Sequence, residues 1–112
     1  MIQAIGTDIV SIDRVAKAMQ NPRFVQRILT ERERGRALTA QYVAGRWAAK
    51  EAVKKCLPQV ASWQHVEIVA EPGQPVSATL LIPMPNPAGH RIHLTISHEK
   101  DFAVAVAILE TP

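Results

Sequence analysis

Asp8, Glu51 and Lys55 are spaced so that folding could bring two carboxylates and one ammonium group together. Asp8 comes near the end of an apolar run typical of a strand, and Glu51 precedes Lys55 by one helical turn. Oxygen ligands suit Mg²⁺, and a metal ion beside a lysine suits a bound pyrophosphate. The spacing therefore favours a magnesium-dependent site for a phosphorylated ligand.

Each of these residues also has an ordinary structural interpretation. Asp8 could cap a helix that follows the strand. A Glu–Lys pair four residues apart is a common stabiliser of helix surfaces, worth roughly 0.2–0.5 kcal/mol, so Glu51 and Lys55 taken alone identify no site. His98, at the end of another apolar run, could be a partly buried strand histidine. Only the context of the whole chain separates the two interpretations.

Patterns in the first half of the chain predict the elements that carry these groups. Residues 2–10 are rich in β-branched side chains, and Gly6 permits close backbone approach, so we expect a strand near a sheet edge with Asp8 close to its end. Ser11 as N-cap and apolar residues at helical spacing predict a helix over residues 12–20, and further helices are expected over residues 23–29 and 41–57. The last of these helices carries Glu51.

Capping and breaking residues set the expected helix ends. Thr30 and Glu33 match a capping box, which predicts that a further helix starts here with Thr30 as its N-cap. We expect an interruption near Thr39 before the long helix. Pro58 should end that helix, because proline cannot continue one.

The second half changes to the two-residue period of β-strands. Strands are expected over residues 66–70, 76–82, 91–96 and 102–109. Residues 71–75 supply a hairpin turn, and the proline-rich residues 83–89 predict an extended surface loop. The fold class is therefore α+β, with an N-terminal strand and helices followed by an antiparallel sheet, in one domain over residues 1–112.

The composition fits a compact domain with a modest core. The chain has 112 residues, of which 47% are hydrophobic and 21% charged, a balance that argues against disorder. Its formal net charge of +3 is too small to indicate nucleic-acid binding, although clustered arginines would favour an acidic partner. We therefore expect no nucleic-acid partner.

Cysteine content and the N-terminus bear on the expected compartment. Cys56 is the only cysteine, so an intramolecular disulfide and a multi-cysteine zinc site are excluded, and a reducing compartment is expected. The first residues lack the features of a secretory signal, and no apolar stretch approaches the roughly 20 residues that cross a bilayer. We expect a cytoplasmic protein with no membrane partner.

Several motifs follow one another along the chain in a specific order. They are Gly6-Thr7-Asp8, the segment from Arg23-Phe24 to Arg27, Arg46-Trp47-Ala48-Ala49-Lys50-Glu51-Ala52, Gly73-Gln74-Pro75 and Ser97-His98. This order resembles the holo-[acyl-carrier-protein] synthases, the small 4'-phosphopantetheinyl transferases, over nearly the whole chain. The resemblance implies the 4'-phosphopantetheinyl transferase fold.

The resemblance also implies an activity. The enzyme would transfer the 4'-phosphopantetheine group of coenzyme A to a serine of an apo acyl carrier protein of fatty-acid or polyketide synthesis, releasing adenosine 3',5'-bisphosphate. Mg²⁺ is the implied cofactor, held against the pyrophosphate by two carboxylates. A homotrimer with the active site near a subunit boundary is implied in the same way.

Site residues are carried over from the resemblance position by position. Asp8 and Glu51 match the metal ligands and Lys55 the lysine that stabilises or protonates the departing phosphate, and these are the expected catalytic residues. His98 matches a histidine that hydrogen-bonds a coenzyme A phosphate. Further phosphate contacts are expected from Arg46 and Lys50. The serine would be activated by Glu51 or by a water beside the metal, and the sequence does not choose between them.

The resemblance also places the carrier-protein surface. Its expected residues are Arg14, Arg23, Phe24 and Arg27. The guanidinium groups would steer an acidic helix of the carrier, and the aromatic ring would offer an apolar anchor. The alternative is an ordinary solvated basic face.

The chain departs from the family pattern at two places near the expected coenzyme wall. Pro58 lies in a turn where the family usually has glycine, and Glu99 stands where threonine often follows the histidine. These departures leave a second interpretation, a catalytically weakened module that binds coenzyme A or the carrier protein. A small basic nucleic-acid binder is a third, but the chain lacks a series of stacking aromatics. Trp47 is expected to pack in the core, and a place beside the coenzyme is the alternative.

Overall fold

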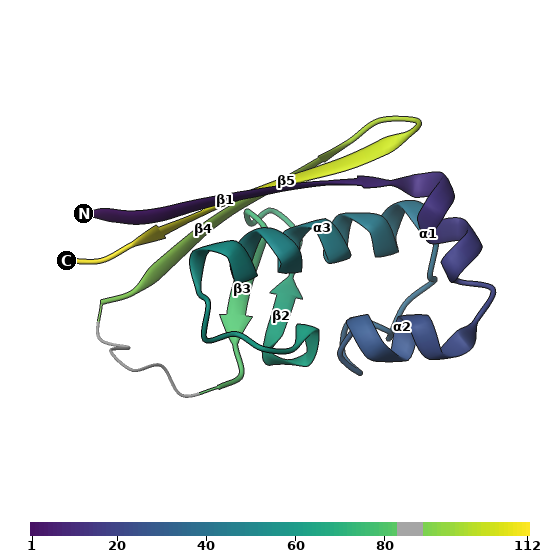
Figure 1. Ribbon diagram of the computed structural model, residues 1–112, viewed down its shortest axis with the longest axis horizontal. Helices are drawn as coiled ribbons and strands as arrows, with labels where there is room; N and C mark the ends of the chain where they lie inside the picture. The colour runs from purple at the N-terminus through teal and green to yellow at the C-terminus, as the bar shows by residue number, and fades with distance from the viewer. Residues whose placement is uncertain (83–88) are drawn as a thin grey trace.

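The computed structural model describes residues 1–82 and 89–112 and has the expected α+β architecture. The long helix α3 (Ala40–Cys56) lies against one face of an antiparallel sheet. That sheet has the order β1-β5-β4, made of β1 (Ile2–Ser11), β5 (Phe102–Glu110) and β4 (Arg91–His98). Figure 1 shows both chain termini at the same end of the sheet. The N-terminal strand is an edge strand, as expected.

Shorter elements surround the long helix. The helices α1 (Ile12–Ala18) and α2 (Pro22–Ile28) lie beside the N-terminal end of α3 (Figure 1). The 3₁₀ helix η1 (Trp63–His65) leads into a two-stranded sheet of β2 (Val66–Val69) and β3 (Ser77–Leu80). The expected turn between these two strands is confirmed, since Gln74 N–H donates to the carbonyl of Glu71 and Gly73 has a φ of 75°.

Small residues let α3 lie close to the sheet. Ala48, Ala49 and Ala52 of the helix are fully buried, and they share a core cluster with alanines of β5. The closest approach is at Gly6 of β1, where a Cβ atom would lie 2.1 Å from the carbonyl oxygen of Ala52. Only glycine fits this contact. The contact fixes the middle of β1 against the half of α3 that carries Glu51.

The opposite face of the three-stranded sheet is not covered by any described element. Ile5 and Ile9 of β1 are 65% and 64% exposed. They pair in register with Ile108 and Val104 of β5. Single exposed apolar residues are ordinary, but a continuous apolar stripe across neighbouring strands is typical of an interaction surface.

The structure contradicts the helix expected at Thr30. The capping-box hydrogen bonds do form: Thr30 N–H donates to Glu33 Oε1 at 2.7 Å, and Glu33 N–H donates to Thr30 Oγ1 at 3.3 Å. They close a turn, not a helix. The reason is that the Glu33 side chain is buried and also accepts hydrogen bonds from Lys50 Nζ and Ile68 N–H. The glutamate therefore ties the turn to α3 and β2.

Other expected boundaries agree with the structure to within a few residues. The helix predicted over 41–57 is α3, the strand predicted over 91–96 extends to His98, and the helix predicted over 12–20 ends at Ala18. The loop predicted over 83–89 lies, apart from Gly89, outside the described residues. None of the helices in the described parts of the chain is long and apolar enough to cross a membrane. The cytoplasmic location stays a prediction.

Candidate active site

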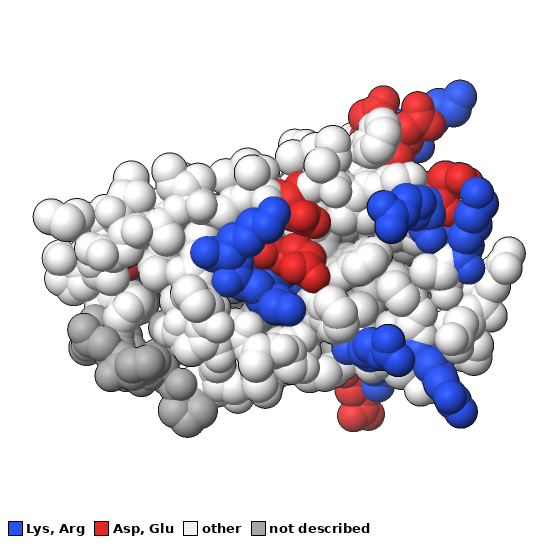
Figure 2. Space-filling view, viewed as in Figure 1, with Lys and Arg blue, Asp and Glu red and all other residues white. Residues whose placement is uncertain are grey.

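The structure brings Asp8, Glu51 and Lys55 together between β1 and α3. Lys55 Nζ donates to the carbonyl oxygen of Thr7 at 2.6 Å and lies 3.4 Å from Asp8 Oδ1. Glu51 is one turn earlier on the same helix, and its Oε1 accepts a hydrogen bond from Trp63 Nε1 at 2.7 Å. Figure 2 shows acidic and basic side chains side by side over the middle of the molecule.

Asp8 lies in surroundings that favour its protonated form, mainly because it is partly buried. Burial raises the pKa of the Asp8 carboxyl above its usual value of 3.8, outweighing the hydrogen bond and charge of Lys55, which lower it. The charge of Glu51 adds to the increase. Because the two carboxylates repel each other, a cation placed between them would stabilise both.

The donor set fits Mg²⁺ bound together with a substrate. The described residues contain no group of three or more histidine, cysteine, aspartate or glutamate side chains that could hold a metal by themselves. Mg²⁺ commonly uses one or two carboxylates and completes its octahedron with waters and substrate phosphates. Asp8 and Glu51 supply that number of carboxylates, and both line a pocket of about 250 Å³. Arg14 and Trp47 line the same pocket.

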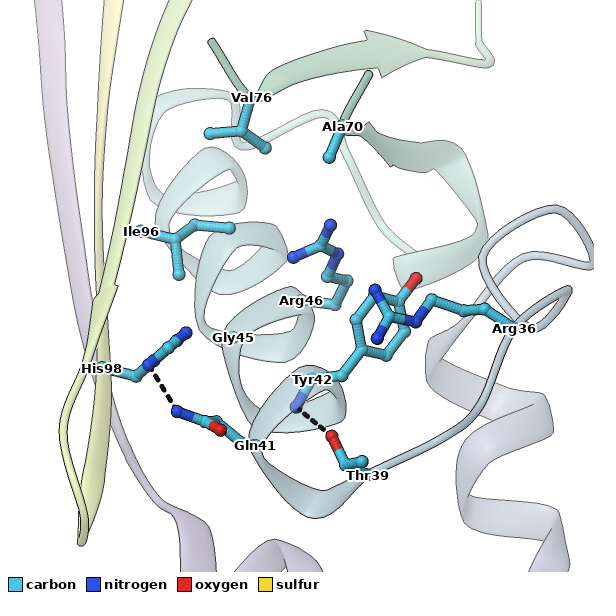
Figure 3. Close-up of a pocket in the computed structure, with 10 residues that line it drawn as sticks. All are labelled: Arg36, Thr39, Gln41, Tyr42, Gly45, Arg46, Ala70, Val76, Ile96 and His98. Atoms are coloured by element: carbon cyan, nitrogen blue, oxygen red, sulfur yellow. Dashed lines mark hydrogen bonds between the residues drawn. The ribbon is translucent and has the colours of Figure 1, made fainter. Parts of the chain in front are cut away.

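A second pocket holds the other expected phosphate contacts. It measures about 320 Å³, and Arg46, Tyr42, Arg36 and His98 are among its lining residues. The guanidinium groups of Arg36 and Arg46 lie 4.1 Å and 4.4 Å from the centre of the Tyr42 ring. Figure 3 shows Arg46 inside this pocket and His98 hydrogen-bonded to Gln41. Arg46 Nε is buried and has no hydrogen-bond partner among the described residues, so the pocket is suited to an anion.

The two pockets are lined by residues of opposite edge strands. Asp8 belongs to β1 and His98 to β4, which are the two edges of the sheet, with β5 between them. The acidic pair with Lys55 therefore forms one part of a site, and the arginine pocket with His98 forms another.

The phosphate contact expected from Lys50 is wrong. This lysine is fully buried, and its Nζ donates to Glu33 Oε1 at 2.6 Å, to the carbonyl of Ile28 at 2.8 Å and to that of Trp63 at 3.0 Å. All its donors are used inside the protein. Burial lowers the pKa of Lys50, although the hydrogen bond and charge of Glu33 oppose that shift. Lys50 is a structural anchor.

The expected carrier-protein residues lie on α1 and α2. Arg14, Arg23 and Arg27 are exposed, and Arg14 also lines the pocket of the acidic pair. Phe24 is only partly exposed, because its ring packs edge-on against Trp47 with centroids 5.2 Å apart. The arginines are therefore accessible to a partner, whereas the aromatic ring contributes to the core.

The two departures from the family pattern lie in turns. Glu99 Oε1 accepts hydrogen bonds from the backbone N–H groups of Asp101 and Phe102, at 2.9 Å and 3.1 Å, so its carboxylate closes the β4–β5 turn. Pro58 is exposed in a turn closed by a hydrogen bond from Val60 N–H to the carbonyl of Leu57. The carboxylate of Glu99 is thus engaged with its own turn.

Sequence reasoning missed Trp63, Tyr42 and Arg36. Trp63 follows the turn after α3, and no local pattern indicates that its indole reaches Glu51. Tyr42 and Arg36 come together because the segment before α3 folds back over the helix. A cluster of arginines around one tyrosine was a usable signal for Tyr42, since guanidinium groups stack on aromatic faces.

Known proteins match this chain over nearly its whole length. Residues 4–107 match the family model of the 4'-phosphopantetheinyl transferase superfamily. A curated holo-[acyl-carrier-protein] synthase from an Exiguobacterium species is 42% identical, over 98% of this chain and 93% of the relative. One from Geobacillus kaustophilus is 39% identical, over 98% of this chain and 90% of the relative.

Crystal structures of such synthases share the fold. The holo-(acyl-carrier-protein) synthase of Bacillus anthracis, in complex with CoA (3',5'-ADP), superposes with a TM-score of 0.84 at 34% identity, over 100% of this chain and 99% of that chain. The Neisseria meningitidis synthase superposes with a TM-score of 0.81 at 28% identity, over 99% and 100%. The chain therefore belongs to the 4'-phosphopantetheinyl transferase superfamily. Within it, the chain is an enzyme of the holo-[acyl-carrier-protein] synthase type.

Proposed function

We propose that residues 1–112 form one domain that transfers 4'-phosphopantetheine from coenzyme A to a serine of an apo acyl carrier protein. The reaction depends on Mg²⁺ and releases adenosine 3',5'-bisphosphate. The observation that carries the proposal is the meeting of Asp8, Glu51 and Lys55 at one place in a transferase fold. The relatives' names and the coenzyme complex of the Bacillus anthracis synthase support it.

The side chains of the acidic pair and the lysine have complementary tasks in this reaction. Asp8 and Glu51 would hold Mg²⁺, which supplies charge neutralisation at the pyrophosphate. Lys55 is fixed by the carbonyl of Thr7, so its ammonium group stays beside Asp8. From there it would donate a hydrogen bond or a proton to the departing phosphate.

The arginine pocket would bind the phosphates of the nucleotide part of coenzyme A. Arg46 has a buried Nε without a hydrogen-bond partner among the described residues, and the guanidinium group of Arg36 lies against the same tyrosine ring. His98 lines this pocket and is exposed. Two guanidinium groups and an imidazole suit a phosphate group.

We further propose a homotrimer in which neighbouring copies complete each active site. The uncovered sheet face carries an apolar stripe of Ile5, Ile9, Val104 and Ile108, and association with other copies of the chain would bury it. A cyclic assembly would also place the Asp8 edge of one copy beside the His98 edge of the next. Light scattering gives the mass of the assembly. Mixing Asp8→Ala and His98→Ala proteins should restore part of the activity that each lacks alone.

The carrier protein would approach over α1 and α2. Exposed Arg14, Arg23 and Arg27 present positive charge to an acidic partner, and Arg14 borders the pocket of the acidic pair. Long-range attraction would raise the rate of encounter and make it sensitive to salt. The partner serine would then reach the pocket next to Asp8.

Intact-protein mass spectrometry of an apo acyl carrier protein tests the proposal. After incubation with this protein, coenzyme A and Mg²⁺, the carrier should gain the mass of one phosphopantetheine group, and EDTA should prevent the gain. Binding of coenzyme A without a mass gain on several carriers would favour the weakened binding module. The turn-capping role of Glu99 argues against that alternative, because the added carboxylate is held by its own backbone.

A further inference from the structure

The carboxylate of Glu51 accepts a hydrogen bond from the indole of Trp63. The indole Nε1 donates to Glu51 Oε1 at 2.7 Å, and the contact is partly buried. The two residues lie on different elements, α3 and η1, joined by the turn that contains Pro58. A metal-ligand carboxylate is thus held by a side chain outside its own helix.

Trp63 is itself held from several sides. Its ring packs edge-on against Trp47 with centroids 6.4 Å apart, and Lys54 Nζ lies 4.7 Å from the ring centre. Its carbonyl accepts a hydrogen bond from the buried Lys50 at 3.0 Å. The indole N–H therefore has a fixed position from which to orient the glutamate.

Donation from a neutral N–H group suits a metal-binding carboxylate. The bond restricts a glutamate side chain that would otherwise lose rotamer freedom when metal binds. It occupies one direction at Oε1 and leaves Oε2 and the remaining lone pairs for the cation. Since an indole carries no charge, it does not compete with the metal as a lysine or arginine would. Outer partners of this kind orient ligating groups in many metal sites.

We propose that Trp63 is a positioning residue that holds Glu51 in the orientation that binds Mg²⁺. The inference rests on the proposed function, because it takes Glu51 as a metal ligand. It predicts that the indole N–H, and not the bulk of the ring, sets the affinity for the metal. The turn after α3, which contains Pro58, then serves to place the Trp63 indole beside Glu51.

The test is a calorimetric titration of Mg²⁺ into full-length protein with saturating coenzyme A and no carrier, so that no turnover occurs. Trp63→Phe keeps an aromatic ring and removes the donor, and it should weaken Mg²⁺ binding by about 10-fold or more. Coenzyme A affinity in EDTA should stay within about twofold. His93→Phe is the matched control, because it removes a ring nitrogen that lies 3.0 Å from the Glu110 carboxylate, outside both pockets, and it should leave Mg²⁺ affinity within about twofold.

The outcomes separate the inference from the proposed function. If the wild-type protein binds Mg²⁺ and Glu51→Ala weakens that binding while Trp63→Phe does not, the role of Trp63 is wrong and the proposed function stands. If neither wild type nor any variant binds Mg²⁺, both are wrong.

A second measurement uses the unmodified protein in case Trp63→Phe does not fold. The chain has only two tryptophans, so its ¹⁵N-labelled form gives two indole N–H signals, which Trp47→Phe assigns. Adding Mg²⁺ to the coenzyme A complex should shift the Trp63 signal, because the carboxylate that accepts its hydrogen bond then shares charge with the metal. An unchanged Trp63 signal under metal-saturating conditions would overturn the inference.

Discussion

Lys55 and Asp8 approach to 3.4 Å, measured from Nζ to Oδ1, at the point where Gly6 lets β1 touch α3. The contact joins residues 47 positions apart in the sequence. Backbone packing therefore positions the proposed catalytic groups, since the missing side chain of Gly6 sets the distance between strand and helix. The predictions below test this arrangement and the roles assigned to its members.

Removal of either carboxylate should abolish transfer while leaving the fold intact. Asp8→Ala and Glu51→Ala each delete a proposed metal ligand, and the lost charge stabilisation, on the order of 4 kcal/mol, corresponds to about a 10³-fold lower rate. Carrier modification followed by mass spectrometry gives the rate, and circular dichroism checks the fold. Retained turnover at saturating Mg²⁺ in either variant would contradict the metal-ligand assignment.

The raised pKa of Asp8 predicts that wild type and Asp8→Asn differ in stability by an amount that depends on pH. Since burial raises this pKa in the folded state, the folded protein holds the proton more tightly than the unfolded chain does. That stabilisation is complete below the usual value of 3.8 and is lost as the pH rises through the raised value. In EDTA, Asp8→Asn should therefore have a higher Tm than wild type at pH 7, and the gap should narrow in acid. A wild-type Tm above that of the variant at pH 7 would contradict this sign.

Gly6→Ala should both destabilise the protein and slow transfer. Its new Cβ would meet the carbonyl of Ala52 at 2.1 Å, so strand and helix must separate, at a cost of about 3 kcal/mol. The Asp8–Lys55 contact would open with them. Gly35→Ala is the matched control, because its new Cβ would lie 3.3 Å from the nearest atom, the carbonyl oxygen of Arg32. It should change the free energy of unfolding by less than about 1 kcal/mol. Urea unfolding measures both, and equal costs for the two variants would refute the close approach.

Lys50→Met should lower the stability of the fold and leave the KM for coenzyme A unchanged. It leaves Glu33 as a buried unpaired charge, which lowers the free energy of unfolding by about 3–5 kcal/mol. Arg46→Ala should do the opposite, raising the KM for coenzyme A about tenfold with little effect on unfolding. A Lys50→Met protein of wild-type stability with a raised KM for coenzyme A would restore Lys50 to the phosphate site.

Arg14→Ala should mainly weaken the apparent affinity for the carrier protein, by about tenfold at low salt. The effect should shrink as ionic strength rises, because screening removes the steering that the arginine provides. Lys17→Ala is the control, since Lys17 is exposed on the same helix and already pairs with Asp13 at 3.2 Å. An unchanged dependence of rate on carrier concentration would remove Arg14 from the docking surface.

Local patterns predicted the elements well because each rests on neighbouring residues. The strand β5 alternates buried alanines with more exposed residues, and α3 ends at Cys56, two residues before Pro58. The failure at Thr30 has a physical cause. The capping box is present, but the Glu33 carboxylate also accepts a hydrogen bond from Lys50 of α3, and the residues after Thr30 form a turn and not a helix.

Site residues that belong to the family motif could be predicted from the sequence, whereas those whose position depends on long-range contacts could not. Asp8, Glu51 and Lys55 come together as the motif implied. Lys50 precedes Glu51 directly, but an α-helix turns by about 100° per residue, so the two side chains point in different directions. One is buried on Glu33 and the other faces the pocket. Trp63 reaches the site only through the tertiary fold.

The most direct test of the proposed transfer is to quantify both products of one reaction. Apo acyl carrier protein, coenzyme A and Mg²⁺ are incubated with the wild-type protein, and adenosine 3',5'-bisphosphate is measured by chromatography beside the modified carrier. We expect equal molar amounts of the two products, and none of either with Asp8→Ala or with EDTA. Bound coenzyme A that yields neither product, with several carriers and saturating Mg²⁺, would contradict the account.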